Sequence, residues 1–183
     1  IENSAVAIIS VNPRQMVLDC KQLTNKLLRV ESQNSPSSVS QTTPLFVDLG
    51  LSVKWATCNL GASKPEEYGN YYAWGETYTK SIYNWTNYKF RTSGDLEDNV
   101  RCSKYVTNSS YGLVDNRTTL EPEDDVAHVK WGGTWRMPTE EDFDELCEIC
   151  TSKWITQNGV KGRIFTGPNG NSIFLPAAGY RNG

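Results

Sequence analysis

The chain has 183 residues, a length that suits one ordinary domain with an appendage. Apolar residues make up 38% and charged residues 21%, which is enough apolar material for a packed core and too little net charge for wholesale disorder. The net charge of −3 without a Lys/Arg block argues against nucleic acid as a partner, and no apolar run approaches the roughly 18 residues of a membrane-spanning helix.

The first 31 residues contain three short apolar stretches that predict strands, at residues 6–11, 16–18 and 27–30. Three such strands cannot bury a core of their own. We expect residues 1–31 to form either a β-rich N-terminal arm docked on the main domain or a partial immunoglobulin-like repeat, and we favour the arm. Residues 32–44 are rich in Ser, Thr and Pro without apolar periodicity, which predicts a solvated linker.

After the linker, apolar and polar residues alternate over nine positions. The apolar members are Val47, Leu49, Leu51, Val53 and Trp55. A period of two is typical of a strand with one buried face. We therefore expect one strand across these residues.

The strongest helix signal begins after Pro138, where Thr139 can cap the helix and three acidic residues suit the positive end of its dipole. An apolar stripe at helical spacing follows: Phe143, Leu146, Cys147, Cys150 and Trp154. This pattern predicts a helix of about four turns that packs on the apolar face of the strand. Arg136, just before it, can reach nearby carboxylates or carbonyl groups.

A shorter helix of the same design is predicted from Glu121-Pro122, with Pro at its first position. Its acidic residues could hold a cation, but we favour an N-terminal turn stabilised by the helix dipole. Near the end of the chain, residues 162–166 and 172–175 flank turn formers at 167–171 and predict a hairpin. Strands, two helices and long loops together indicate an α+β domain.

The five cysteines do not show a metal-ligand spacing, because the Cys147/Cys150 pair stands without a second pair or a His cluster. We expect no metal. Cys58 and Cys150 are candidates for a disulfide if the protein is exported, and buried free thiols are the alternative.

Three stretches carry a family resemblance: VDLGLSVKWATCNLGASKPEEYGNYYAWGET (residues 47–77), WGGTWRMPTEEDFDELCEICTSKWITQNGVKG (131–162) and NGNSIFLPAAGYRNG (169–183). In this order they resemble the Fibrobacter succinogenes major paralogous domain, which is abundant in exported proteins of gut Bacteroidetes. The WRMPT motif is also similar to the W-R-L-P-T segment of C-type-lectin-like domains, a group that includes the formylglycine-generating enzymes.

The resemblance implies a C-type-lectin-like domain over residues 45–183, with antiparallel strands, two helices and long loops. Family members usually continue with several more strands, so we expect this domain to lack its usual C-terminal strands. It also implies a secreted or outer-surface location, with a lipid anchor through a segment outside this sequence as an open alternative.

The candidate ligand surface lies in residues 68–90, where nine of 23 residues are aromatic. Rigid rings beside amide groups suit sugar faces and protein contacts. We predict that Tyr83, Trp85 and Tyr88, with Asn84 and Asn87, bind a glycan or a surface protein. An extended chain would place Tyr83 and Trp85 on one face, whereas the alternative is that these rings fill the core.

Enzyme constellations are sparse in the sequence. His128 is the single histidine and sits beside apolar residues, which favours a packing or surface role. We therefore expect a non-catalytic binding module without a catalytic residue or cofactor. The alternative is a structural or tip subunit of a surface appendage, assembled through the N-terminal strands. A carboxylate-pair glycosidase or a formylglycine-generating type of enzyme ranks below both.

Overall fold

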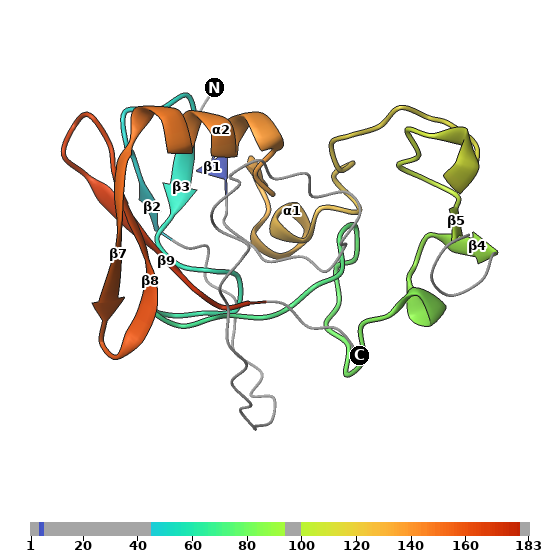
Figure 1. Cartoon of the computed structure of the whole chain (residues 1–183), viewed down its shortest axis with the longest axis horizontal. Coiled ribbons are helices and arrows are strands. Elements are labelled where there is room, and N and C mark those ends of the chain that lie inside the picture. The colour runs from blue at the N-terminus through green and yellow to red at the C-terminus, as the bar shows by residue number, and fades with distance from the viewer. Residues whose placement is uncertain (1–3, 6–44, 94–99, 180–183) are drawn as a thin grey trace.

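The computed structural model describes residues 4–5, 45–93 and 100–179 (Figure 1). A first sheet has the strand order β2-β3-β1-β6 and contains β1 (Ser4–Ala5), β2 (Phe46–Val47), β3 (Lys54–Ala56) and β6 (Trp135–Arg136). A two-stranded sheet pairs β4 (Arg91–Ser93) with β5 (Arg101–Cys102). The third sheet is an antiparallel meander of β7 (Thr151–Gln157), β8 (Val160–Thr166) and β9 (Ser172–Pro176).

Two α-helices and two short 3₁₀ helices complete the described elements: α1 (Val126–Trp131), α2 (Glu140–Ile149), η1 (Trp85–Asn87) and η2 (Ser109–Tyr111). The predicted α+β class is confirmed. Apart from β1, the predicted arm and linker lie outside the described residues. None of the described helices is long and apolar enough to cross a membrane.

The predicted single strand over residues 47–55 is wrong, because the chain turns back between β2 and β3, which pair antiparallel. Gly50 adopts a φ of +78° in this turn, and its N–H donates to Asp48 Oδ1 at 2.8 Å. The alternation did predict burial correctly, since Leu49 and Trp55 are both fully buried. Apolar residues thus face the core from a turn as well as from strands.

The main core joins the β2–β3 turn to α2, as the sequence predicts, and also to the third sheet. Its buried members are Leu49, Val53, Trp55, Leu146, Cys150, Phe165 and Ile173, with Val47, Leu51 and Phe143 packed against them. Figure 1 shows α2 running above β3 and β7. Burial of this apolar surface is the dominant stabilising contribution in this part of the molecule.

The predicted four-turn helix is too long, since α2 ends at Ile149 and Cys150 already has extended dihedral angles. The following seven residues form β7, which is rich in Thr, Ile and Trp side chains that suit a strand. Trp154 therefore leaves the predicted stripe and is 53% exposed. The Asn158-Gly159 dipeptide, with φ values of 48° and 83°, makes the two-residue hairpin turn that pairs β7 with β8.

The WRMPT motif fixes the start of α2. Thr139 and Asp142 form a reciprocal capping box, in which the Thr139 hydroxyl accepts from Asp142 N and the Asp142 carboxylate accepts from Thr139 N. The Arg136 guanidinium donates to both oxygens of Asp142, at 2.5 and 2.9 Å. This bidentate pair confirms the expected reach of Arg136 to a carboxylate.

The hairpin of β8 and β9 is confirmed, whereas the shorter helix begins later than predicted. Asp125, not the Glu121-Pro122 step, precedes α1, and its Oδ1 accepts from Ala127 N and His128 N.

Cys58 and Cys150 are free thiols, as are Cys102 and Cys147, so the predicted disulfide is not formed. Cys20 lies outside the described residues.

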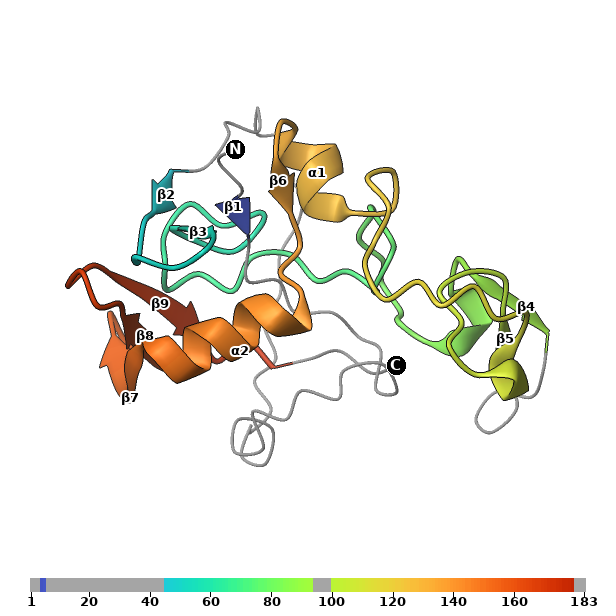
Figure 2. The ribbon, with the colours of Figure 1, turned by 90° about the horizontal axis from the view of Figure 1, so that it is seen from above.

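Residues 74–93 and 100–124 form a second region that extends away from the main core and carries β4 and β5 at its far end (Figure 2). Its strands are two or three residues long, so few backbone ladders hold it. Side-chain contacts must therefore order its long loops, and these contacts build the candidate site.

Candidate functional site

Five aromatic rings form a chain of edge-to-face contacts through the second region, in the order Trp85, Tyr88, Phe90, Tyr105 and Trp74. We call this set the ring ladder. Neighbouring ring centroids are between 4.7 and 5.7 Å apart, and the interplanar angles lie between 74° and 87°. This is the geometry that aromatic quadrupoles prefer, so each ring fixes the orientation of the next.

Trp85 stands at one end of the ring ladder and is partly exposed. It lies in η1, so the predicted extended conformation over Tyr83 and Trp85 is wrong. Asn84 causes the change, because its side-chain oxygen accepts from Asn87 N and caps the 3₁₀ turn. The Trp85 ring consequently rests against Tyr88, at a centroid distance of 5.4 Å.

Tyr83 belongs to the core and not to the predicted platform. Its side chain is 3% exposed, its hydroxyl donates to Tyr71 O at 2.5 Å, and it accepts from Lys80 N at 2.8 Å. The hydroxyl group is thus used within the fold. The prediction that Tyr83 contacts a ligand is therefore wrong, because the ring is buried and the chain is not extended through Trp85.

Tyr88 packs against the Trp85 ring and is less accessible than a surface residue. It is partly buried, and its hydroxyl donates to Trp74 O at 3.1 Å. Burial, with the nearby Cys102, Glu76, Tyr105 and Asp124, raises the pKa of Tyr88 above its ordinary value. Tyr88 is therefore a neutral donor whose ring contacts Trp85, so it positions the outer ring.

The two predicted amides play unequal parts. Asn87 donates to Ile82 O at 2.9 Å, and its Oδ1 accepts from Lys80 Nζ at 3.0 Å. Asn84 is exposed, and its cap uses the side-chain oxygen. Asn87 is bonded within this loop, whereas Asn84 is exposed and precedes Trp85 in the sequence.

Lys80 organises this surface, although the sequence did not single it out. Its ammonium group binds Glu76 at 2.6 Å and the carbonyl of Asn87 at 2.8 Å. Glu76 is 7% exposed and also accepts from Lys89 N at 2.7 Å. The i,i+4 spacing of Glu76 and Lys80 is the one sequence pattern that could have indicated this ion pair. It is a common pattern on helix surfaces, however, and the structure has no helix at these residues.

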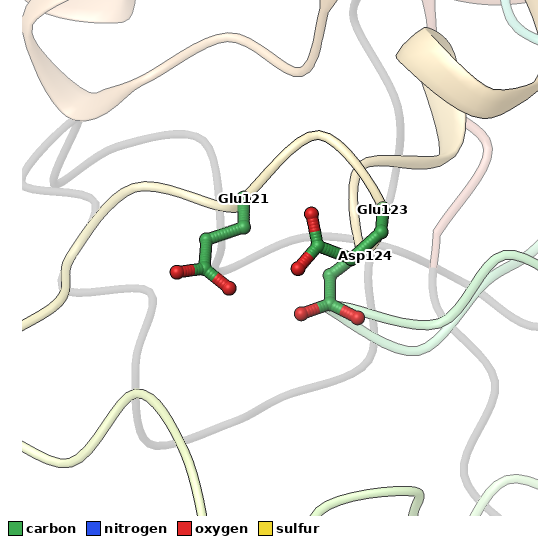
Figure 3. A group of neighbouring side chains, drawn as sticks. All are labelled: Glu121, Glu123 and Asp124. Atoms are coloured by element: carbon green, nitrogen blue, oxygen red, sulfur yellow. The ribbon is translucent and has the colours of Figure 1, made fainter.

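Beside Tyr105, the fourth ring of the ladder, three carboxylates lie within 4.8 Å of one another (Figure 3). They belong to Glu121, Glu123 and Asp124, which precede α1 and do not form its first turn. The prediction that they form the first turn of the helix is therefore wrong for these three residues, and Lys104 contacts all three carboxylates.

Asp124 is the buried member of this cluster, at 2% exposure. It accepts from Lys89 and Lys104, each at 2.5 Å, and from the Tyr105 hydroxyl at 2.7 Å. Burial alone would raise the pKa of Asp124, but the hydrogen bonds from Lys104 and Lys89 outweigh it and lower the pKa to about 2. Lys104 also pairs with Glu121, so ammonium groups occupy the space that a cation would need.

His128 lies in the last turn of α1 and is partly buried. Its carbonyl accepts from Gly132 N at 2.8 Å, which closes the helix. This placement agrees with a packing or surface role.

No protein-family model, curated protein or solved structure matches this chain. The fold class therefore rests on the structure, and the family resemblance rests on the three sequence stretches.

Proposed function

We propose that the chain is a non-catalytic extracellular binding module with a C-type-lectin-like fold, secreted or displayed at a bacterial surface, which contacts a carbohydrate or a surface protein through Trp85. The observation that carries this proposal is the partly exposed Trp85 ring, held edge-to-face on Tyr88 at 5.4 Å. A ring that is oriented before binding loses little conformational entropy when a ligand stacks on it.

Polar groups around the ring support a sugar or a polar protein surface as the ligand. Asn84 and Thr86 flank Trp85 in sequence and are exposed. Sugars present apolar C–H faces edged by hydroxyl groups, so an aromatic ring next to amide and hydroxyl groups matches both parts. The same arrangement fits protein hot spots, where Trp is enriched.

Asp124 and Glu76, two carboxylates beside the ring ladder, are bound by lysines and do not suit the proton donor of glycoside hydrolysis. A glycosidase needs a carboxylic acid with a raised pKa that donates a proton. Asp124 has its pKa lowered to about 2 by lysine hydrogen bonds that outweigh its burial, and Glu76 is bound by Lys80. Asp124 is therefore ionised at neutral pH and acts as a structural acceptor.

A structural or tip subunit of a surface appendage is the second candidate function, and β1 is the observation that favours it. Ser4 and Ala5 lie between β3 and β6 and pair parallel with both strands. A segment far from β3 in sequence thus completes the first sheet, as a donated strand does. Exchange of this segment between copies would assemble subunits without new contacts.

Binding to an array of bacterial and host glycans and to immobilised surface proteins tests the main proposal. Trp85→Ala should weaken binding about 30-fold or more, the effect of removing about 2 kcal/mol, while the protein stays folded. Tyr78→Ala is the matched control, since Tyr78 is a 74% exposed ring of the same region outside the ladder. Wild-type affinity in Trp85→Ala would contradict the proposal.

A further inference from the structure

The most open sheet edge among the described residues belongs to β7. All seven of its residues pair with β8 without a bulge, and no described strand pairs with its other side. Proteins usually blunt such an edge with charges, proline, a bulge or a very short strand. The sequence TSKWITQ has no proline, and Lys153 is its one charged residue.

The hairpin geometry identifies the backbone groups that face outward from β7. Across a two-residue turn, Gln157 and Val160 form a hydrogen-bonded pair, and pairs of this kind alternate along the ladder. The backbone N–H and C=O groups of Ser152, Trp154 and Thr156 therefore point away from β8.

An independent hydrogen bond supports this alternation. Lys161 opposes Thr156, and its carbonyl accepts from Ala177 N at 2.8 Å. The backbone of Lys161 thus faces the β9 side, so the pair of Thr156 and Lys161 is not hydrogen-bonded within the hairpin. The N–H and C=O of Thr156 face the open edge for the same reason.

An apolar ring sits at this open edge. Trp154 is the middle residue of β7 and is 53% exposed. By strand alternation its side chain lies on the sheet face that carries Phe165, which is 2% exposed and part of the main core. Arg163 is the direct cross-strand neighbour of Trp154 on this face, and the indole stands at the edge of the sheet, open to solvent in an isolated copy.

We propose that β7 pairs antiparallel with β7 of a second copy of this chain, about a two-fold axis that passes beside Trp154. In this register Trp154 opposes the partner subunit's Trp154, and Ser152 opposes the partner subunit's Thr156. Every outward N–H and C=O group is then hydrogen-bonded, and all seven residues of β7 are paired. The two indole rings meet on one face of a continuous sheet that runs from β9 of one copy to β9 of the other.

The charges select this register over its neighbours. If the two-fold axis passed beside Lys153 instead of Trp154, Lys153 would lie directly opposite the partner subunit's Lys153. Like charges in such a pair are destabilising. In the proposed register Lys153 opposes the partner subunit's Ile155. If the axis passed beside Ile155, Ser152 would lie opposite the β7–β8 turn of the second copy, and fewer residues of β7 would be paired. Two antiparallel copies of β7 therefore complement each other best when they are centred on Trp154.

Sedimentation equilibrium of the full chain, over about 1 µM to about 1 mM, tests the proposal. The wild type should show a monomer–dimer equilibrium, and Trp154→Lys and Trp154→Glu should each weaken it about tenfold or more, since each sets like charges opposite one another. An equimolar mixture of the two variants should associate again, because only a contact of residue 154 with itself brings the opposite charges together. A monomeric wild type, or variants that associate as the wild type does, would overturn the proposal.

Amide hydrogen exchange of the wild type gives a test without a variant. Raising the protein concentration should slow exchange at Ser152, Trp154 and Thr156, and leave Lys153 and Ile155 unchanged, because their amides already bind β8. Equal protection at both sets at every concentration would contradict the pairing. Exchange of the β1 segment would not produce this alternating pattern, so the two modes of assembly are distinguishable.

Discussion

The main core and the second region are stabilised by different interactions. In the main core, aliphatic and aromatic side chains from the β2–β3 turn, α2 and the third sheet bury one another, and Leu49, Trp55 and Leu146 are fully inaccessible. In residues 74–93 and 100–124, the ring ladder and the ion pairs of two lysines with the buried Asp124 order long loops. The first type of contact is insensitive to charge, whereas the second depends on the ionisation of Asp124.

Backbone conformation follows the same division. Tyr105 in the second region has a φ of +62°, which is unfavourable for an aromatic residue. Its N–H donates to Asp115 Oδ2 and its hydroxyl to Asp124, each within 2.8 Å. The carboxylates of Asp115 and Asp124 thus stabilise a backbone conformation at Tyr105 that does not occur in a β-strand. A loop region can thus present oriented rings when a buried carboxylate such as Asp124 binds several of its segments.

The largest expected effect is on the main core. Leu146→Ala should lower the free energy of unfolding by about 2–5 kcal/mol, because Leu146 is fully buried in the main core and truncation leaves a cavity. Chemical denaturation monitored by circular dichroism measures this loss. Ile149→Ala is the matched control, since Ile149 is 52% exposed at the end of the same helix. Equal losses in both variants would mean that α2 does not pack on the core as described.

A smaller, pH-dependent effect is expected in the second region. The pKa of Asp124 falls from the ordinary 3.8 to about 2 on folding, so the carboxylate stabilises the fold above about pH 4. This contribution is lost as the pH falls toward 2, and the shift corresponds to about 2 kcal/mol. Denaturation at pH 6, 4 and 2 should show that Asp124→Asn removes this part of the acid sensitivity.

The control for this effect is Glu123→Gln, because Glu123 is 68% exposed and lies 3.7 Å from Lys104. Its stability profile should follow that of the wild type. If Asp124→Asn kept the full acid sensitivity, the anchoring role of Asp124 would be contradicted. Leu146→Ala should lose the same stability at each pH, which sharpens the contrast between the regions.

The elements predicted correctly are those encoded by local signals. Thr139 caps α2, Arg136 reaches a carboxylate, and the turn formers at 167–171 join β8 to β9. The two errors in the main core arose where a local pattern has two structural meanings. Alternation at 47–55 marks burial in a turn as well as in a strand, and the helical spacing of Trp154 coincided with a strand.

The candidate site was harder to predict from sequence. The aromatic density pointed to this segment, and Trp85 is partly exposed, which leaves its predicted contact with a ligand as a proposal. Tyr83 is buried instead, because the Asn84 cap changes the direction of the chain. The anchor at Asp124 joins Lys89 and Lys104 across 35 and 20 positions, and no short-range pattern reveals such a pairing.

The most direct test of the proposed function uses the six tryptophans as reporters. Each indole N–H gives its own signal in a ¹H–¹⁵N nuclear magnetic resonance spectrum, and the strongest-binding oligosaccharide or protein from the array is titrated into labelled protein. The Trp85 signal should shift in proportion to saturation, while that of the fully buried Trp55 stays in place. Shifts at Trp154 or Trp131 with none at Trp85 would contradict the account.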